Sequence, residues 1–229
     1  MSKLVLWFVK LTGFIPQIFY FRKKVYYVNK KVTSRKIKGS AILVSNHKRL
    51  FDFALYMYLF LSRDIYTVIG EVMFNKGKLF GWFLKKIGGI KVERDNYDFG
   101  FLSKCIDLLN RGKVVEIFPE GRLPLKEETG VLSFKPSFVY LALESGAPII
   151  PLYTNGSYAC KKRTKVVIGE AIYAQDLYDS NKTEKENIDY ICNYVRSYIT
   201  DPRRDSEGST GFAGGIDRQV LRELKENVI

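Results

Sequence analysis

Residues 39–61 read GSAILVSNHKRLFDFALYMYLFL and pass from one kind of secondary structure to another within a few positions. The run SAILVSN (40–46) is apolar and β-branched and ends in polar residues, which is typical of a buried strand that leads into a turn. The run FDFALYMYLFL (51–61) is apolar on nearly all sides and long enough for a buried helix. A strand, a polar turn and a buried helix in this order predict an α/β domain.

The chain on either side of this stretch repeats the alternation of strand and helix. Further strands are expected at DIYTVIG, GIKVER, KVVEI, PIIPLYT and TKVVIGEAI, and further helices at GKLFGWFLKKIGG, YDFGFLSKCIDLLNRGK, FKPSFVYLALESGAP and EKENIDYICNYVRSYIT. This pattern predicts a single α/β domain with a mostly parallel mixed sheet flanked by helices. In such folds the functional groups lie in loops at the strand ends.

The basic residues are concentrated at the N-terminal end of the chain. The formal net charge is +13, yet residues 1–51 contain twelve Lys and Arg and no acid, so Asp52 is the first carboxylate. Beyond residue 51 the two signs nearly balance, which leaves a basic end on a neutral body. The three cysteines, Cys105, Cys160 and Cys192, have no metal-like spacing and are expected to be free thiols in a reducing compartment.

The basic end also carries the most apolar segment, from Leu4 to Phe21, which Lys10, Pro16 and Gln17 interrupt. A transmembrane helix needs about 20 predominantly apolar residues, so a segment lying on the bilayer surface fits better. Its aromatic side chains would enter the acyl boundary and its cations would face anionic headgroups. The alternatives are a helix packed on the protein's own core and a cleaved signal peptide, and nucleic acid is not expected as a partner.

These observations divide the chain into three parts. Residues 1–38 are predicted to be the membrane-associating segment, 39–200 the catalytic domain, and 201–229 a linker with a C-terminal helix or tail. The protein is accordingly expected at the membrane, peripheral or monotopic, on the cytoplasmic face, in contact with membrane lipids and an anionic surface.

His47 is the only histidine of the chain, and Asp52 follows it five positions later. Histidine is the commonest general base near neutral pH, and a carboxylate at Nδ1 fixes the tautomer that leaves Nε2 free. The two can meet if His47 lies in the turn and Asp52 in the first turn of the helix. The alternative is a histidine without a special role. A metal site lacks ligands, and a serine hydrolase lacks its Gly-x-Ser-x-Gly elbow.

Two further motifs suit an anion. FPEGR (118–122) follows the strand KVVEI, and a loop of this kind can present backbone N–H groups and a guanidinium fork to a phosphate. GGIKVER ends in Arg94, which could supply a second guanidinium. Read singly, FPEGR is compatible with an ordinary turn, and Arg94 with a solvated charge.

Together these motifs resemble the glycerophospholipid acyltransferase family, of which the 1-acylglycerol-3-phosphate acyltransferases are typical members. The four blocks are N-H-x4-D at 46–52, G-x5-R at 88–94, F-P-E-G-R at 118–122 and APIIPL at 147–152. Their order and separations match the family's blocks over roughly residues 40 to 170. The first and third blocks are the specific ones.

The resemblance implies an O-acyltransferase that acylates 1-acylglycerol 3-phosphate to phosphatidic acid. It makes His47 the base and Asp52 its orienting partner, with direct attack of the acceptor hydroxyl on an acyl thioester. It implies no cofactor and no metal, and the acyl donor is acyl-CoA or acyl-carrier protein. The residues that it assigns to substrate binding are Asn46, Arg94, Glu120, Gly121 and Arg122.

Three departures from the family pattern bear on the acceptor. Lys48 and Arg49 follow His47 where Ser or Thr is common, residues 123–133 form a charged loop suited to a lid, and the common F-K-x-G is here FKPS (134–137). A different lysolipid acceptor therefore stays an alternative. So do a non-catalytic lipid- or nucleic-acid-binding protein and a thioesterase in which the same base activates water.

Overall fold

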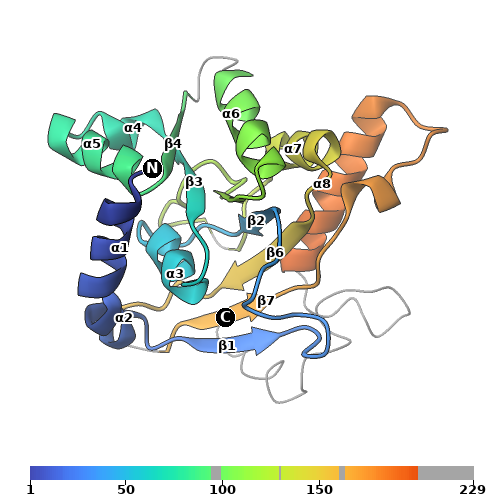
Figure 1. Ribbon diagram of the computed structural model, residues 1–229. Helices are drawn as coiled ribbons and strands as arrows, with labels where there is room; N and C mark the ends of the chain where they lie inside the picture. The colour runs from blue at the N-terminus through green and yellow to red at the C-terminus, as the bar shows by residue number, and fades with distance from the viewer. Residues whose placement is uncertain (94–98, 129, 160–162, 201–229) are drawn as a thin grey trace.

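The computed structural model describes residues 1–93, 99–128, 130–159 and 163–200. A seven-stranded sheet runs through its centre, with helices on both faces (Figure 1). The strands are β1 (Lys24–Tyr27), β2 (Ala41–Ser45), β3 (Ile65–Gly70), β4 (Gly89–Val92), β5 (Val114–Ile117), β6 (Ile149–Thr154) and β7 (Lys165–Ile168). The helices are α1 (Lys3–Thr12), α2 (Phe14–Phe21), α3 (Asp52–Leu59), α4 (Glu71–Phe74), α5 (Lys78–Lys86), α6 (Phe99–Asn110), α7 (Ser137–Ser145), the 3-10 helix η1 (Ala174–Leu177) and α8 (Glu184–Thr200).

The strand order is β1-β7-β6-β2-β5-β3-β4. The central strand β2 is parallel to both of its neighbours, with Ile42 opposite Val115 of β5 and Ile149 of β6. Within the described residues, only β6 and β7 run antiparallel. The predicted mostly parallel mixed sheet in one α/β domain is therefore confirmed. The parallel strands bring their carboxyl ends to one edge, where β2 and β5 deliver the polar loops.

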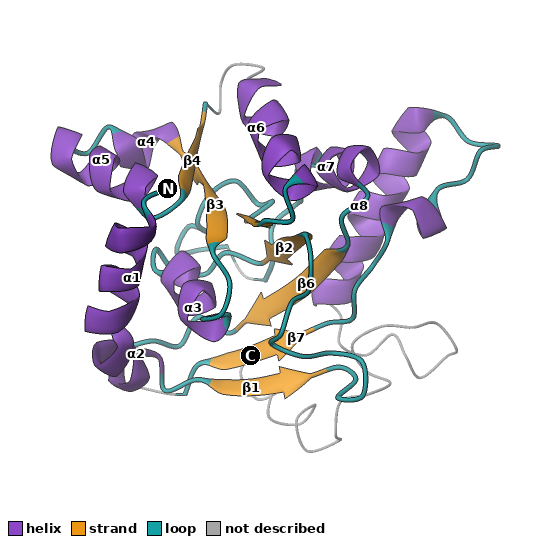
Figure 2. Ribbon diagram, viewed as in Figure 1, coloured by secondary structure: helices purple, strands orange, loops and turns teal. Residues whose placement is uncertain are grey.

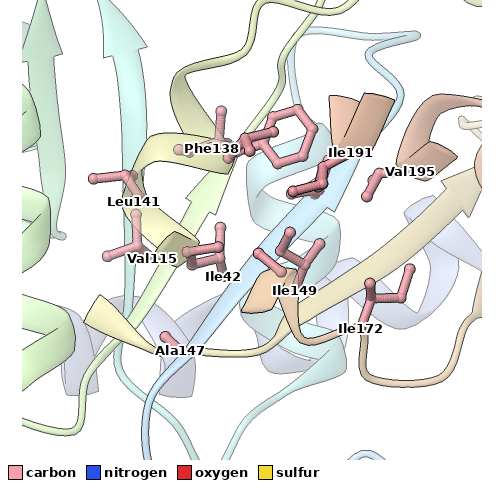
Figure 3. Packing of buried hydrophobic residues seen from close by; sticks show 14 of the residues in the cluster. Ile42, Val115, Phe138, Leu141, Ala147, Ile149, Ile172, Ile191 and Val195 are labelled. Atoms are coloured by element: carbon pink, nitrogen blue, oxygen red, sulfur yellow. The ribbon is translucent and has the colours of Figure 1, made fainter. Parts of the chain in front are cut away.

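Alternate residues of each strand face two separate cores, as the pleat requires. On one side Ile42 and Ile149 pack against α6, α7 and α8. Figure 3 shows Phe138 and Leu141 of α7 with Ile191 of α8 over these strands. On the other side Leu43 packs with α1, α2 and α3. Strands enclosed on both faces explain the continuous apolar runs in the sequence (Figure 2).

The N-terminal segment forms two helices and a strand. α1 and α2 meet at an angle of 55° at Gly13, and in the described part of the chain only this bent pair, taken as one, has the length and apolar composition of a membrane span. β1 follows and pairs in parallel with β7 at the edge of the sheet. Residues 24–27, grouped with the membrane segment in the sequence interpretation, are thus part of the sheet. The predicted linker and tail at 201–229 lie outside the described residues.

A carboxyl group lies in the centre of the sheet. Glu116 of β5 is fully buried, and one of its oxygens accepts a hydrogen bond from Thr67 Oγ1 at 2.6 Å. Its other oxygen has no hydrogen-bond partner among the described residues. Burial raises the pKa of Glu116 well above its ordinary value, the charge of Asp52 adds to this effect, and the bond from Thr67 opposes it.

We expect Glu116→Gln to stabilise the protein more as the pH rises. The unfolded carboxyl releases its proton near its ordinary pKa and the folded one only at higher pH, so the wild type loses stability between the two values, by up to about 1.4 kcal/mol per pH unit. Glutamine keeps an acceptor for Thr67 and does not titrate. Urea unfolding at several pH values measures this, with Glu127→Gln, an exposed acid, as the control. If the free energy of unfolding of wild type and of Glu116→Gln changed with pH in parallel, the prediction would be contradicted.

Candidate active site

The turn after β2 brings His47 and Asp52 together. Nδ1 of His47 lies 2.8 Å from Oδ2 of Asp52, the first residue of α3. The side chain of His47 is 18% exposed, that of Asp52 is fully buried, and the imidazole stacks on the ring of Phe118 at 4.4 Å between centroids. The helix starts where the sequence analysis requires it, so two residues five apart can share a contact.

Asp52 accepts hydrogen bonds from several directions. Oδ2 also accepts the backbone N–H groups of Lys48 at 2.7 Å and Arg49 at 2.9 Å, while Oδ1 accepts from the hydroxyl of Tyr158. Burial, reinforced by the charge of Asp52, raises the pKa of Tyr158, which keeps its hydroxyl protonated as a donor. Because Oδ2 serves as an acceptor, Nδ1 of His47 carries the hydrogen and Nε2 is left as the basic nitrogen.

Two further predicted residues hold the turn in place. Glu120 accepts the backbone N–H of His47 on one oxygen at 2.7 Å and that of Leu132 on the other at 2.8 Å. The side-chain amide of Asn46 both donates to and accepts from the backbone of Thr154 at 2.9 and 2.8 Å. Both side chains are buried, and their oxygens are occupied by the protein's own backbone. Substrate binding by Asn46 and Glu120 therefore stays a prediction, while their positioning contacts are evident.

Helix α8 is connected to the same turn through the loop at 130–132. Arg196 of α8 donates to the carbonyl oxygens of Val131 and Leu132, both at 2.9 Å. Leu132 in turn donates to Glu120, which holds the backbone of His47. Arg196 is thus a positioning residue, connected to His47 through three consecutive hydrogen bonds. The sequence offers no signal for it, because it lies far outside the recognised motifs.

Replacing Arg196 by alanine should alter the environment of His47 without touching it. The loss of two partly buried hydrogen bonds should lower the free energy of unfolding by about 1–3 kcal/mol. His47 is the only histidine, so its ring gives the only imidazole signals in an NMR spectrum, and they should shift. Arg196→Lys should give a smaller shift. The control Arg111→Ala removes only a surface ion pair with Asp107, and equal shifts in the two alanine variants would contradict the positioning role.

A cavity of about 740 Å³ opens beside His47. Its walls come from α3 to α7, from β3, β4 and β5, and from the loop after β5, and most of its lining is apolar and aromatic. The apolar lining residues include Phe53, Val68, Ile69, Met73, Phe80, Phe83, Leu84, Val92, Phe101, Leu102 and Phe118. This volume and composition suit a ligand with a long hydrocarbon part, one end of which lies at the imidazole.

Among the described residues, the cations that line the cavity do not include the predicted arginines, Arg94 and Arg122. Arg94 lies outside the described residues. Arg122 does not line the cavity; its guanidinium donates to both oxygens of Glu128 at 2.5 Å. Lys135 does line it, beside Gly121, whose φ of +70° keeps the loop tight. The sequence signal for Lys135 is the Phe-Lys pair of the FKPS stretch (134–137).

The described side chains form no group of three His, Cys, Asp or Glu residues close enough to hold a metal ion. Cys105 and Cys192 are buried and unpaired, and burial raises their pKa values to about 12 and about 11. Neither thiol is placed to act as a nucleophile.

Comparison with known proteins assigns the fold and motifs to a family. The family model described as Acyltransferase matches residues 24–155, more than half of the chain. The chain belongs to the acyltransferase family. This match includes His47, Asp52 and the FPEGR loop, so the predicted family is confirmed.

Two relatives of this acyltransferase-family chain carry the same activity in their names. It is 24% identical over 174 residues, 73% of its length, to a 1-acyl-sn-glycerol-3-phosphate acyltransferase of Cocos nucifera, of which 55% is covered. It is 30% identical over 121 residues to that of Bacillus subtilis (strain 168), covering 51% of this chain and 58% of the relative. The chain thus spans little more than half the length of these curated relatives.

A solved structure shares the fold. The 1-acyl-sn-glycerophosphate acyltransferase PlsC of Thermotoga maritima superposes with a TM-score of 0.54 at 18% identity, covering 85% of this chain and 78% of that one. At this identity the likeness supports the α/β architecture of the acyltransferase-family chain and nothing finer.

Proposed function

We propose that this protein is a membrane-associated O-acyltransferase that converts 1-acylglycerol 3-phosphate to phosphatidic acid. The observation that carries the proposal is the His47–Asp52 pair at the end of an apolar cavity of about 740 Å³. The acyl donor is acyl-CoA or acyl-carrier protein. The names of the relatives support the acceptor, and the cavity supports an acyl substrate.

The chemistry follows from the contacts of His47. Nε2 removes the proton of the acceptor hydroxyl while the hydroxyl oxygen attacks the thioester carbonyl carbon. A C–O bond forms, the C–S bond breaks, and the departing thiolate takes the proton from the imidazolium. Asp52 stabilises that imidazolium and holds the ring. A lipid substrate that fills the apolar space beside His47 and Phe118 would limit the access of water, which would otherwise take the acyl group.

Cations around the FPEGR loop are proposed to bind the acceptor's phosphate. Arg122 and Arg94 are the predicted clamp, and Lys135 adds a cation on the cavity wall itself. Arg122 already holds an anion in this structure, the carboxylate of Glu128, in the two-pronged geometry that a phosphate would use. Phosphate binding by Arg122 in this two-pronged geometry would displace Glu128.

Glu128→Gln is expected to lower KM for a phosphate-bearing acceptor by about twofold to fivefold, with kcat little changed, because an exposed ion pair competes only modestly. The hydrogen bond from Arg122 lowers the pKa of Glu128 to about 2, so the carboxylate competes throughout the physiological pH range. Steady-state kinetics with 1-acylglycerol 3-phosphate measures the effect, and Glu127→Gln, the exposed neighbouring acid, is the matched control. An unchanged KM in Glu128→Gln would remove Arg122 from the proposed clamp.

The N-terminal helices support the proposed place at a membrane, because their apolar sides face outward. Leu4, Trp7, Phe8 and Leu11 form one stripe of α1 and are 57–76% exposed. The polar Lys10 points to the body instead and donates to the carbonyl oxygens of Leu61 and Arg63 at 3.1 and 2.7 Å.

On α2 too, a polar side chain faces the body and apolar side chains face outward. Gln17 is 6% exposed and accepts a hydrogen bond from Lys23, while Ile15 and Phe19 are 66% and 65% exposed. Leu6 and Phe21 pack inward, but the other large apolar side chains named here stay exposed while Lys10 and Gln17 point to the body. Exposed apolar stripes of this kind fit an apolar surrounding.

The direct test is acyl transfer from labelled acyl-CoA and labelled acyl-carrier protein to a panel of lysolipids in vesicles. The expected result is labelled phosphatidic acid from 1-acylglycerol 3-phosphate. Acylation of another lysolipid in preference to it would correct the acceptor. Free fatty acid released at the same rate with and without acceptor would identify a thioesterase. Absence of all three products with both donors would overturn the enzyme proposal.

A further inference from the structure

We propose that the outer face of α5 is a second membrane contact, continuous with the apolar stripe of α1, and that its occupant is the anionic surface of a bilayer. This α5 face consists of Lys78, Leu79, Trp82, Lys85 and Lys86. The inference rests on the proposed membrane association and adds to it the orientation in which the protein lies.

The α5 face exposes large apolar side chains. Leu79 is 79% exposed and Trp82 is 51% exposed, and Val72 on the adjoining α4 is 58% exposed. The opposite side of the helix is firmly packed, since Leu84 is buried and a Cβ on Gly81 would lie 2.6 Å from the carbonyl oxygen of Phe74. The helix is therefore anchored through its inner side, and its outer apolar residues have no cover in the described structure.

The charges of this region favour an anionic partner. Between Glu71 and Glu93 the chain has five lysines and no acid. Lys86 lies over the ring of Trp82, 5.5 Å from its centroid. Tryptophan and lysine side by side are typical of the headgroup region of a bilayer, because the indole is part apolar and part polar and the ammonium pairs with lipid phosphates.

The two faces adjoin in space. The backbone N–H of Ser2, the N-cap of α1, donates to the carbonyl oxygen of Lys86 at the end of α5 at 2.8 Å. Figure 1 shows α1 descending from beside α5 along the same side of the molecule. The chain has two tryptophans, and both lie on this surface, Trp7 on α1 and Trp82 on α5.

The position of α5 relates this surface to the cavity. Phe80 and Phe83 of the same helix line the cavity, and so does Lys76 immediately before it. One side of α5 thus faces the proposed bilayer while another borders the space beside His47. A lipid substrate could then pass between bilayer and cavity over the width of one helix, with its charged group near Lys76.

The two tryptophans allow a direct test in the full-length protein. Trp7→Phe leaves Trp82 as the only indole reporter, and Trp82→Phe leaves Trp7. Each variant is mixed with vesicles of phosphatidylcholine alone or with phosphatidylglycerol, and with the same lipids carrying brominated chains. We expect the fluorescence of both reporters to shift to the blue with anionic vesicles and to be quenched by brominated lipid.

The possible results distinguish the α5 contact from membrane association in general. If Trp7 responds and Trp82 does not, α1 binds the bilayer and the α5 inference is overturned alone. If neither responds, membrane association itself fails and the inference falls with it. A blue shift of Trp82 that depends on protein concentration without vesicles would mean that a second copy of the chain covers α5, which also overturns it.

A charge variant gives an independent measurement. Leu79→Glu is expected to weaken binding to anionic vesicles by about tenfold or more, as the loss of a buried leucine and the gain of a repelled carboxylate predict. Tyr190→Glu is the matched control, since Tyr190 is 48% exposed on α8, on the far side of the molecule (Figure 1). Equal vesicle affinity of the two variants would contradict the inference.

Discussion

His47→Ala should lower the rate of acyl transfer by about 10²–10⁴-fold, the usual contribution of a positioned general base. Without the imidazole the acceptor hydroxyl would have to lose its proton to water, which the apolar lining of the cavity disfavours. Single-turnover transfer from labelled acyl-CoA measures the chemical step directly. KM for the acceptor should change little, because the cations and the apolar walls that are proposed to bind it stay in place.

His47→Ala needs a control for folding, since it leaves Asp52 with one donor fewer. His47→Gln offers one, because the amide can still donate to Asp52 but cannot take a proton at neutral pH. The two variants should be equally inactive although they differ in stability. Activity in His47→Gln close to that of the wild type would show that the imidazole is not the base.

Asp52→Asn should impair both catalysis and folding. An asparagine has one oxygen and one NH₂ group, so it cannot satisfy the three donors at Oδ2 and the hydroxyl of Tyr158 together. We expect a loss of about 10²-fold or more in rate, through misorientation of His47, and a fall of about 1–3 kcal/mol in the free energy of unfolding. Urea unfolding and single-turnover transfer measure the two losses.

Tyr158→Phe separates these losses. It removes the donor to Oδ1 and leaves every bond to Oδ2, so it should reduce stability with a small effect on the rate. If Tyr158→Phe slows the reaction as much as Asp52→Asn, the hydroxyl of Tyr158 has a part in the chemistry that the contact with Asp52 does not explain.

The sequence alone permitted prediction of those features that depend on local pattern. The strand-turn-helix at 40–61 predicted the contact of His47 with Asp52, because His47 lies in the turn and Asp52 begins the helix that follows. The repeated apolar runs predicted the mostly parallel sheet. β1 was not predicted, because four residues at a sheet edge in a basic segment lack the long apolar run of a buried strand.

Features that depend on distant residues were not accessible in the same way. Tyr158 reaches Asp52 across 106 positions, and Arg196 reaches Leu132 across 64. No spacing rule connects such pairs, since only the folded sheet brings them together. The composition of residues 4–21 indicated a segment lying on a bilayer surface, but the placement of Lys10 and Gln17 against the body could be seen only from the tertiary contacts.

The hydrogen bonds between Asn46 and Thr154 suggest when, during synthesis, the turn that carries His47 becomes ordered. They span 108 positions, and contacts between distant parts of a chain form late in folding because they close long loops. A ribosome-bound chain that ends before β6 has His47 but neither Thr154 nor Tyr158 to set its turn. A nascent chain therefore carries an unoriented imidazole, and the proposed base is held by all of its contacts only after the sheet has been completed.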